Sequence, residues 1–195
     1  MARISPLPNS ELGPLGERFD QMAKTNGYVP NSLPTMARVP GLAEAFGQLA
    51  AAVMSNPKLP ASLLHMTAHI ASTAAGCRYC QAHSAHNAEH AGVSKEKLGE
   101  LWSWETSEHF DESERAALRL AFHAASVPNA VTDELIDEVR AHFDDDQITG
   151  LVAVVSMFGF LNRWNDTMAT DLEDTPHDFA HAVLTAQGWD AGAHR

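Results

Sequence analysis

The chain has only two cysteines, Cys77 and Cys80, and their three-residue spacing places them on the same side of a helix. They follow Gly76 and begin a run without glycine or proline, so the sequence predicts that one helix ends at Gly76 and the next starts at Cys77. In the first turn of a helix, free N–H groups and the positive end of the dipole stabilise a thiolate. One sulfur could then attack an electrophile while the other resolves the resulting sulfenic acid or mixed disulfide. A redox dithiol is therefore the leading interpretation.

Histidines surround this pair along the sequence. A polar stripe follows the second cysteine within roughly 80° of arc, at about 100° per residue: Cys80, His83, Asn87 and His90. His83 lies one turn from Cys80 and is placed to exchange its proton. On the preceding helix, His65 and His69 share one face, and either would approach the cysteines if the two helices pack antiparallel.

A structural zinc site is the main alternative within this segment, and its four ligands would be Cys77, Cys80, His83 and His86. Zinc needs four ligands that converge tetrahedrally. On one continuous helix, however, His86 points about 120° away from Cys80. We therefore expect neither a metal nor another cofactor.

The pattern that must position these residues is helical almost throughout. Long spans without Gly or Pro, with apolar residues at three- and four-residue spacing, predict an all-α fold with helices at 42–56, 60–75, 77–91, 94–107, 111–126, 132–143, 147–170 and 176–187. The stretch 148–161 is apolar on nearly every face, which predicts the buried centre of the domain.

The chain divides into three parts by composition. Residues 1–40 hold six of the ten prolines, so this extension should form only short helices and drape over the body or reach a neighbouring subunit. Residues 41–175 form the predicted helical domain, and residues 176–195 a C-terminal helix and tail.

Charge and hydropathy limit the possible partners. The formal net charge is −12, which disfavours a nucleic-acid partner. No stretch approaches the roughly 20 apolar residues of a membrane span, and the start of the chain lacks the apolar run of a signal peptide. We therefore expect no membrane partner and a cytoplasmic location, where a close cysteine pair is more often catalytic or metal-binding than structural.

Four blocks in order resemble the AhpD-like, carboxymuconolactone decarboxylase superfamily of all-α alkyl hydroperoxidase proteins. They are Gly76-Cys77-Arg78-Tyr79-Cys80-Gln81-Ala82-His83, Ala91-Gly92-Val93, Asp111-Glu112-Ser113-Glu114-Arg115-Ala116-Ala117-Leu118 and Phe160-Leu161-Asn162-Arg163-Trp164-Asn165-Asp166. The resemblance covers roughly residues 40 to 175. It implies an oligomeric helical bundle with peroxidase activity.

The resemblance also implies roles for individual residues. Cys80 would attack a hydroperoxide, Cys77 would condense with it to a disulfide, and a thiol or lipoyl-type reductant would regenerate the pair. The family has a Glu and a His where this chain has His65 and Ser84, so His83 and His65 are the expected proton-relay residues. A disulfide reductase, or a non-enzymatic redox sensor or zinc-binding module, remains the alternative function.

A polar cluster ends the long apolar helix, and it contains Arg163. Arginine is seldom buried without a partner. We therefore expect Arg163 to pair with an acid such as Asp166 or Glu173, which would fix a subunit interface or the floor of the site.

Overall fold

The computed structural model describes residues 2–195, and every regular element among these residues is helical, as the sequence predicts. The α-helices are α1 (Pro14–Asn26), α2 (Ser32–Met36), α3 (Leu42–Met54), α4 (Ala61–Ala75), α5 (Arg78–His90), α6 (Lys95–Gly99), α7 (Glu112–Ala125), α8 (Asp133–Arg140), α9 (Asp145–Met168) and α10 (Asp174–Leu184). Short 3-10 turns are η1 (Asn9–Glu11), η2 (Leu101–Ser103), η3 (Thr185–Gln187) and η4 (Gly192–His194).

Several helix starts carry the capping residues that the sequence shows. Asp111 begins α7 with a reciprocal capping box to Glu114, and Asp144 begins α9 in the same way with Gln147. Both arrangements satisfy backbone N–H groups that have no partner inside the helix. These local signals explain why the predicted starts of α7 and α9 agree with the structure within a few residues.

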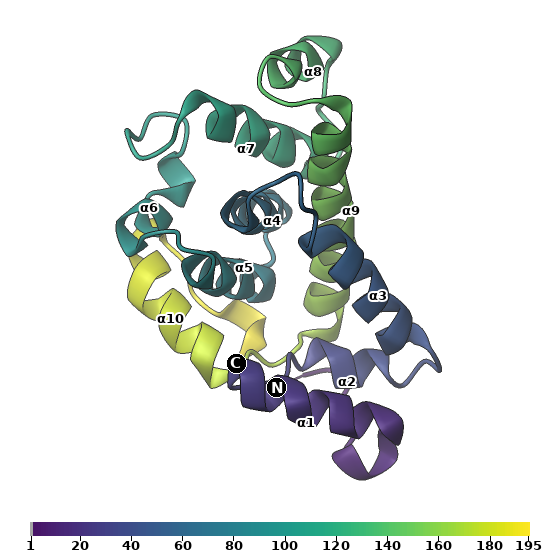
Figure 1. Ribbon diagram of the computed structural model, residues 1–195. Coiled ribbons are helices and arrows are strands. Elements are labelled where there is room, and N and C mark those ends of the chain that lie inside the picture. Colours follow the sequence, from purple (N-terminus) through teal and green to yellow (C-terminus); the bar gives the residue numbers. More distant parts are fainter. Residues whose placement is uncertain (1) are drawn as a thin grey trace.

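The centre of the bundle is α4, whereas the sequence predicted that the stretch 148–161 would take this place. Figure 1 shows α4 end-on, with α5, α7 and α9 around it. Residues of α9 such as Val152 and Phe160 are 40% and 38% exposed. The prediction was wrong because α9 lies at the side of the bundle, so it has neighbours on only part of its circumference. Apolar residues on its other face remain at the surface.

The predicted helix 94–107 is interrupted. It forms α6 and the short turn η2, which are separated at Glu100. Gly99 has a low helix propensity and ends α6. Despite this interruption, Leu98 and Leu101 are buried in the core.

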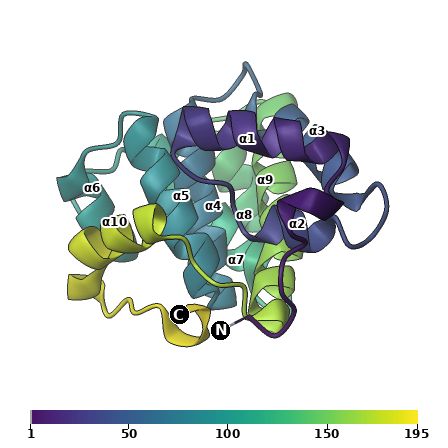
Figure 2. The same ribbon diagram turned by 90° about the horizontal axis from the view of Figure 1, so that it is seen from below.

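The N-terminal segment drapes over the body, as predicted. In Figure 2 α1 lies across the bundle, and the two ends of the chain lie near each other. The Arg3 guanidinium donates hydrogen bonds to the carbonyls of Asp166 and Thr167. The expectation of short helices alone was wrong, because α1 has 13 residues. Pro14 occupies its first turn, where the missing N–H costs nothing.

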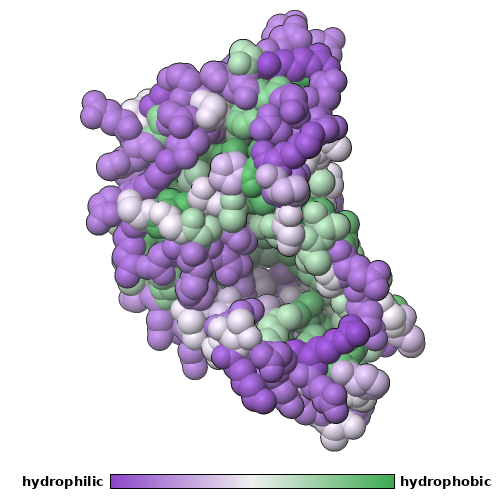
Figure 3. All heavy atoms as spheres, viewed as in Figure 1, coloured by the Kyte–Doolittle hydropathy of each residue, from purple (hydrophilic) through white to green (hydrophobic). Residues whose placement is uncertain are grey.

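Polar side chains cover most of the face seen in Figure 3, with apolar patches between them and a hollow in its lower half, above the N-terminal helices. No helix within residues 2–195 is long and apolar enough to span a membrane.

Candidate active site

The two cysteines lie where the sequence predicts, at the start of α5. Gly76 ends α4 in the left-handed conformation with φ of 80°, which glycine adopts without strain, and Cys77 is the N-cap of α5. The backbone N–H of Cys80 donates to Cys77 Sγ over 3.4 Å. Both thiols are free and buried, with exposed fractions of 0% for Cys77 and 2% for Cys80. The fold therefore brings the two sulfur atoms together and shields them from bulk water.

The surroundings of the two thiols differ. The side-chain hydrogen bond to Cys80, burial, and the nearby negative charges of Cys80 and Asp166 raise the pKa of Cys77 well above its ordinary value. Cys77 thus retains its proton, which it can direct at the sulfur of Cys80. The Asn165 amide donates a second hydrogen bond to Cys80 Sγ over 3.4 Å. Cys80 Sγ thus accepts hydrogen bonds from both the Cys77 thiol and the Asn165 amide, an arrangement suited to Cys80 as the attacking thiol.

His83 belongs to a network that also contains Glu173, a residue just before α10. His83 Nε2 lies 2.7 Å from Glu173 Oε2, and both side chains are largely buried. Glu173 Oε1 accepts hydrogen bonds from the Tyr79 hydroxyl at 2.8 Å and from the backbone N–H of Asn31 at 2.5 Å. The Tyr28 hydroxyl lies 3.4 Å from His83 Nδ1. Residues from the N-terminal extension, α5 and the segment before α10 thus meet around one imidazole.

The charges in this network follow from its burial. Burial acts to raise the pKa of Glu173, but the hydrogen bond and charge of His83 and the Asn31 N–H outweigh it, and the pKa is lowered. Burial, together with the charge of Glu173, raises the pKa of Tyr28 to about 12. Glu173 is therefore a carboxylate at neutral pH, and Tyr28 is a neutral phenol. The contacts of His83 go to Glu173 and the two tyrosines, so any proton it exchanges with Cys80 must cross a gap that no direct hydrogen bond spans.

The histidines of α4 have no carboxylate partner. His69 Nδ1 lies 3.1 Å from the carbonyl of Gln81 and 3.2 Å from Ser84 Oγ, and Ser84 donates to the carbonyl of Cys80 over 2.7 Å. His65 lies one helical turn farther from the cysteines, and its buried Nδ1 has no hydrogen-bond partner. Burial lowers the pKa of both histidines to about 4. The structure thus connects His69 and Ser84 to the backbone at Cys80, and it leaves His65 farther away.

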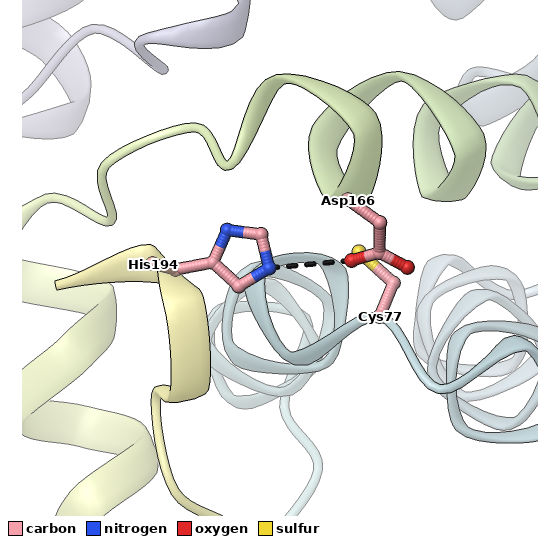
Figure 4. Close-up of side chains that lie close together, drawn as sticks. All are labelled: Cys77, Asp166 and His194. Atoms are coloured by element: carbon pink, nitrogen blue, oxygen red, sulfur yellow. Dashed lines mark hydrogen bonds and ion pairs between the residues drawn. The ribbon is translucent and has the colours of Figure 1, made fainter. Parts of the chain in front are cut away.

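The four ligands of the alternative zinc site do not converge. His86 stacks edge-on against His90, with ring centroids 4.4 Å apart, and contacts Phe179, while His83 faces Glu173. Within residues 2–195, the structure brings a different group of metal-ligating side chains together: Cys77, Asp166 and His194 (Figure 4). In this group, His194 Nε2 lies 3.2 Å from Asp166 Oδ1.

Arg163 does not form the predicted ion pair. It is exposed and donates to the carbonyl of Gly159, one turn back on α9. Glu173 instead binds His83 and Tyr79, and Asp166 binds His194. The expectation was wrong because Arg163 lies on the outer face of α9, where water satisfies its charge.

Sequence reasoning did not assign Tyr28, Asn165 and His194 to the site, and it considered Glu173 and Asp166 only as partners of Arg163. Asn165 and Asp166 fall within the block 160–166 that carried the family resemblance, so the sequence did offer a signal for assigning them to the site. Tyr28 and His194 lie far from the cysteines in sequence, in segments without a motif. Their part in the site depends on how both ends of the chain fold back.

Comparison with known proteins shows which proteins this chain resembles. A family model described as the carboxymuconolactone decarboxylase family matches residues 40–123. YdfG of Bacillus subtilis (strain 168) is 31% identical over 91 residues, which are 46% of this chain and 60% of that protein. YnjA of Escherichia coli (strain K12) is 34% identical over 93 residues, 47% of this chain and 50% of that protein. The matches thus span about half the length of these curated relatives.

Solved structures match over nearly the whole chain. The debrominase Bmp8 is 33% identical, with a TM-score of 0.84 over 92% of this chain and 97% of that one. A cysteine-to-alanine variant of it, solved in complex with 2,3,4-tribromopyrrole, is 32% identical over 92% of this chain and 96% of that one, with a TM-score of 0.85. A peroxidase-related protein with an AhpD core from Ralstonia eutropha JMP134 is 21% identical over 90% and 94% of the two chains, with a TM-score of 0.82, and it supports the fold alone.

Proposed function

Because a model of the carboxymuconolactone decarboxylase family matches residues 40–123, we propose that this protein is a thiol-dependent reductase that passes two electrons from Cys77 and Cys80 to a hydroperoxide. The observation that carries this proposal is the pair of adjacent buried thiols at the start of α5, with the Asn165 amide donating a hydrogen bond to Cys80 Sγ. The choice of a hydroperoxide as substrate follows from the sequence resemblance to the alkyl hydroperoxidase proteins.

The proposed cycle has three steps. The Cys80 thiolate attacks the distal oxygen of the hydroperoxide, the O–O bond breaks, and the alkoxide takes a proton and leaves as an alcohol. Cys77 then displaces water from the Cys80 sulfenic acid and forms a disulfide. An external thiol or lipoyl-type dithiol reduces the disulfide and is itself oxidised.

His83 is the proposed source of the proton for the leaving group. A histidine beside a carboxylate can bind a proton and donate it to a leaving group. Glu173 supplies that carboxylate. The sequence also suggested His65 as a relay member. Because His65 lies one helical turn beyond His69, it would act in the proton relay only through other residues.

The likeness to the debrominase, which is stronger than that to the peroxidase-related protein, supports a second candidate reaction. A dithiol can replace a carbon–bromine bond of a small aromatic ring by a carbon–hydrogen bond, and the dithiol is then oxidised to a disulfide as bromide and a proton leave. This reaction needs the same two thiols and no other reductant in the first turnover. The two candidates differ in the electrophile, not in the dithiol.

One stopped-flow experiment tests both. The reduced protein is mixed with hydrogen peroxide, an organic hydroperoxide or a bromopyrrole, and free thiols are counted before and after. We expect two thiols to disappear per hydroperoxide consumed. Faster thiol loss with the bromopyrrole, with stoichiometric bromide release, would favour the second candidate.

Two single variants assign the roles of the thiols. Cys77→Ser should react once and accumulate a sulfenic acid at Cys80 that dimedone traps, because the resolving thiol is missing. Cys80→Ser should not react at an appreciable rate. Turnover retained in both variants would disprove the dithiol cycle, and an exposed-histidine variant, His181→Ala, serves as the control.

We further propose that the protein works as a homo-oligomer. A groove of about 660 Å³ borders Asp166 and is lined in part by Val127 and Val152, and these two side chains are 84% and 40% exposed. Exposed apolar side chains around one groove are typical of protein contact surfaces. A mass measured by light scattering that equals one chain would exclude this.

A further inference from the structure

We propose that Cys77, Asp166 and His194 form a Zn²⁺ site, and that zinc bound there reversibly blocks the dithiol. The three side chains come from the start of α5, the last turn of α9 and the C-terminal turn η4, and Figure 4 shows them directed at a common space. Cysteine sulfur, histidine nitrogen and carboxylate oxygen are the donors that zinc takes in proteins.

The distances between the three donor atoms fit a tetrahedral zinc site after small movements of the side chains. The three donor atoms all lie within 4.8 Å of one another. At zinc–ligand distances of about 2.0–2.3 Å, ligand atoms in a tetrahedral site lie roughly 3.5 Å apart. Rotation of the partly exposed Asp166 side chain can supply this contraction. A fourth position remains open for water.

The orientation of His194 supports its role as a ligand. Its Nδ1 lies 2.8 Å from the carbonyl of Thr170, and a carbonyl only accepts, so Nδ1 carries a proton and donates it. The other ring nitrogen, Nε2, faces Asp166 Oδ1 at 3.2 Å. Metal-bound histidines are usually fixed in this way, by a backbone carbonyl on the other nitrogen.

The C-terminal segment holds this histidine firmly. The Leu172 N–H donates to the carbonyl of His194 over 2.8 Å, and the Trp189 indole donates to the carbonyl of Arg78 over 3.2 Å. Arg78 directly follows Cys77, so the segment is attached to the helix turn that carries the thiol. The His194 side chain is 4% exposed, whereas that of Asp166 is 43% exposed. A metal ion can therefore enter past Asp166.

The proposed block of the dithiol rests on the proposed function. Zinc binds the thiolate, so the thiol proton of Cys77 is released and its sulfur lone pair is shared with the metal. Cys77 can then no longer displace water from a sulfenic acid at Cys80. Because zinc has no redox chemistry of its own, removing it restores the reduced dithiol unchanged.

The test measures metal binding separately from turnover. Reduced, metal-free protein is titrated with Zn²⁺ against a chromophoric chelator, and with Co²⁺, whose thiolate complex shows a charge-transfer band. We expect one ion per chain and one cysteine ligand. Loss of a residue that only orients a ligand costs about 10–100-fold in affinity, so Asp166→Asn and His194→Gln should each weaken binding at least that much.

Two further variants complete the comparison. Cys77→Ser should lose the charge-transfer band, whereas Cys80→Ser should keep it, and His181→Ala is the control. Asp166 is partly exposed, so Asp166→Asn keeps the test valid if His194→Gln fails to fold. The proposal is overturned if zinc does not bind stoichiometrically, or if binding needs Cys80 and not Asp166 and His194.

The effect on turnover is a separate result. Stoichiometric zinc should stop hydroperoxide reduction by the wild-type protein, and a chelator should restore it. If zinc binds but turnover continues, the zinc site is confirmed, but its proposed inhibition of the dithiol is disproved. If the dithiol reduces no hydroperoxide at all, metal binding alone still decides whether the site exists.

Discussion

Two pairs of histidines lie in opposite electrostatic settings. One pair lies on α4, and the other lies on α5 and in the C-terminal turn η4. His65 and His69 are desolvated and have no carboxylate partner, so burial lowers the pKa of each to about 4. His83 and His194 each lie beside a carboxylate, Glu173 and Asp166, supplied by a distant part of the chain. A neighbouring carboxylate supplies a proton acceptor or a second metal ligand, which the α4 histidines lack. The second pair is therefore the one suited to moving protons or binding a metal.

The largest expected effect concerns the stability contributed by His69. Its pKa is about 4 in the folded chain and 6.5 in the unfolded chain. Between these values only the unfolded state takes up the proton, so stability is complete above pH 6.5 and falls as the pH decreases toward 4. The shift corresponds to about 3 kcal/mol. Urea denaturation of His69→Gln should show a flatter pH profile over this range, whereas the exposed-site variant His181→Gln should follow the wild type. Identical slopes in all three would contradict the assignment.

The second-largest expected effect is a loss of kcat/KM when His83 is replaced, which tests whether His83 acts in catalysis. His83→Gln removes the proton donor but keeps a polar side chain beside Glu173. We expect kcat/KM for a hydroperoxide to fall about 100-fold, the lower range for loss of a general acid. The His181→Gln protein again serves as the control. A loss below threefold would show that the leaving group takes its proton from elsewhere.

A smaller loss is expected when the counter-charge is removed. Glu173→Gln leaves His83 in place but without its carboxylate, and we expect kcat/KM to fall about tenfold. The variant also has a stability signature. The pKa of Glu173 is lowered on folding, so its contribution is present above pH 4.5 and is lost as the pH falls through the lower folded value. This acid-dependent loss should be absent from Glu173→Gln, and its persistence would argue against the ion pair.

The smallest effect should come from His65, although the family resemblance drew attention to this position. His65→Gln removes a neutral imidazole with no hydrogen-bond partner on Nδ1. We expect turnover to change by less than about threefold, which is below about 0.7 kcal/mol. A loss as large as that in His83→Gln would restore His65 to the proton relay and remove the contrast between the two groups.

Local signals in the sequence account for most of the helices. The positive-φ Gly76 and the N-cap Cys77 fix the start of α5, and Asp111 and Asp144 fix two other helix starts. The errors concern the interrupted helix 94–107, the length of α1 and, above all, burial. The apolar stretch 148–161 reads as central, but burial depends on how completely neighbouring elements enclose a helix, and a larger share of α4 than of α9 is buried. The pattern within one segment carries no information on that enclosure.

The sequence by itself determined the dithiol: its spacing, its place at a helix start and its all-α setting follow from interactions within a few residues. Only the tertiary structure decided which charges surround it. Glu173 lies 90 residues from His83, and His194 lies 28 residues from Asp166 and farther still from Cys77. Electrostatic interactions depend on distance in space and on the exclusion of water. Neither quantity exists until the N-terminal extension and the C-terminal segment have closed over α5.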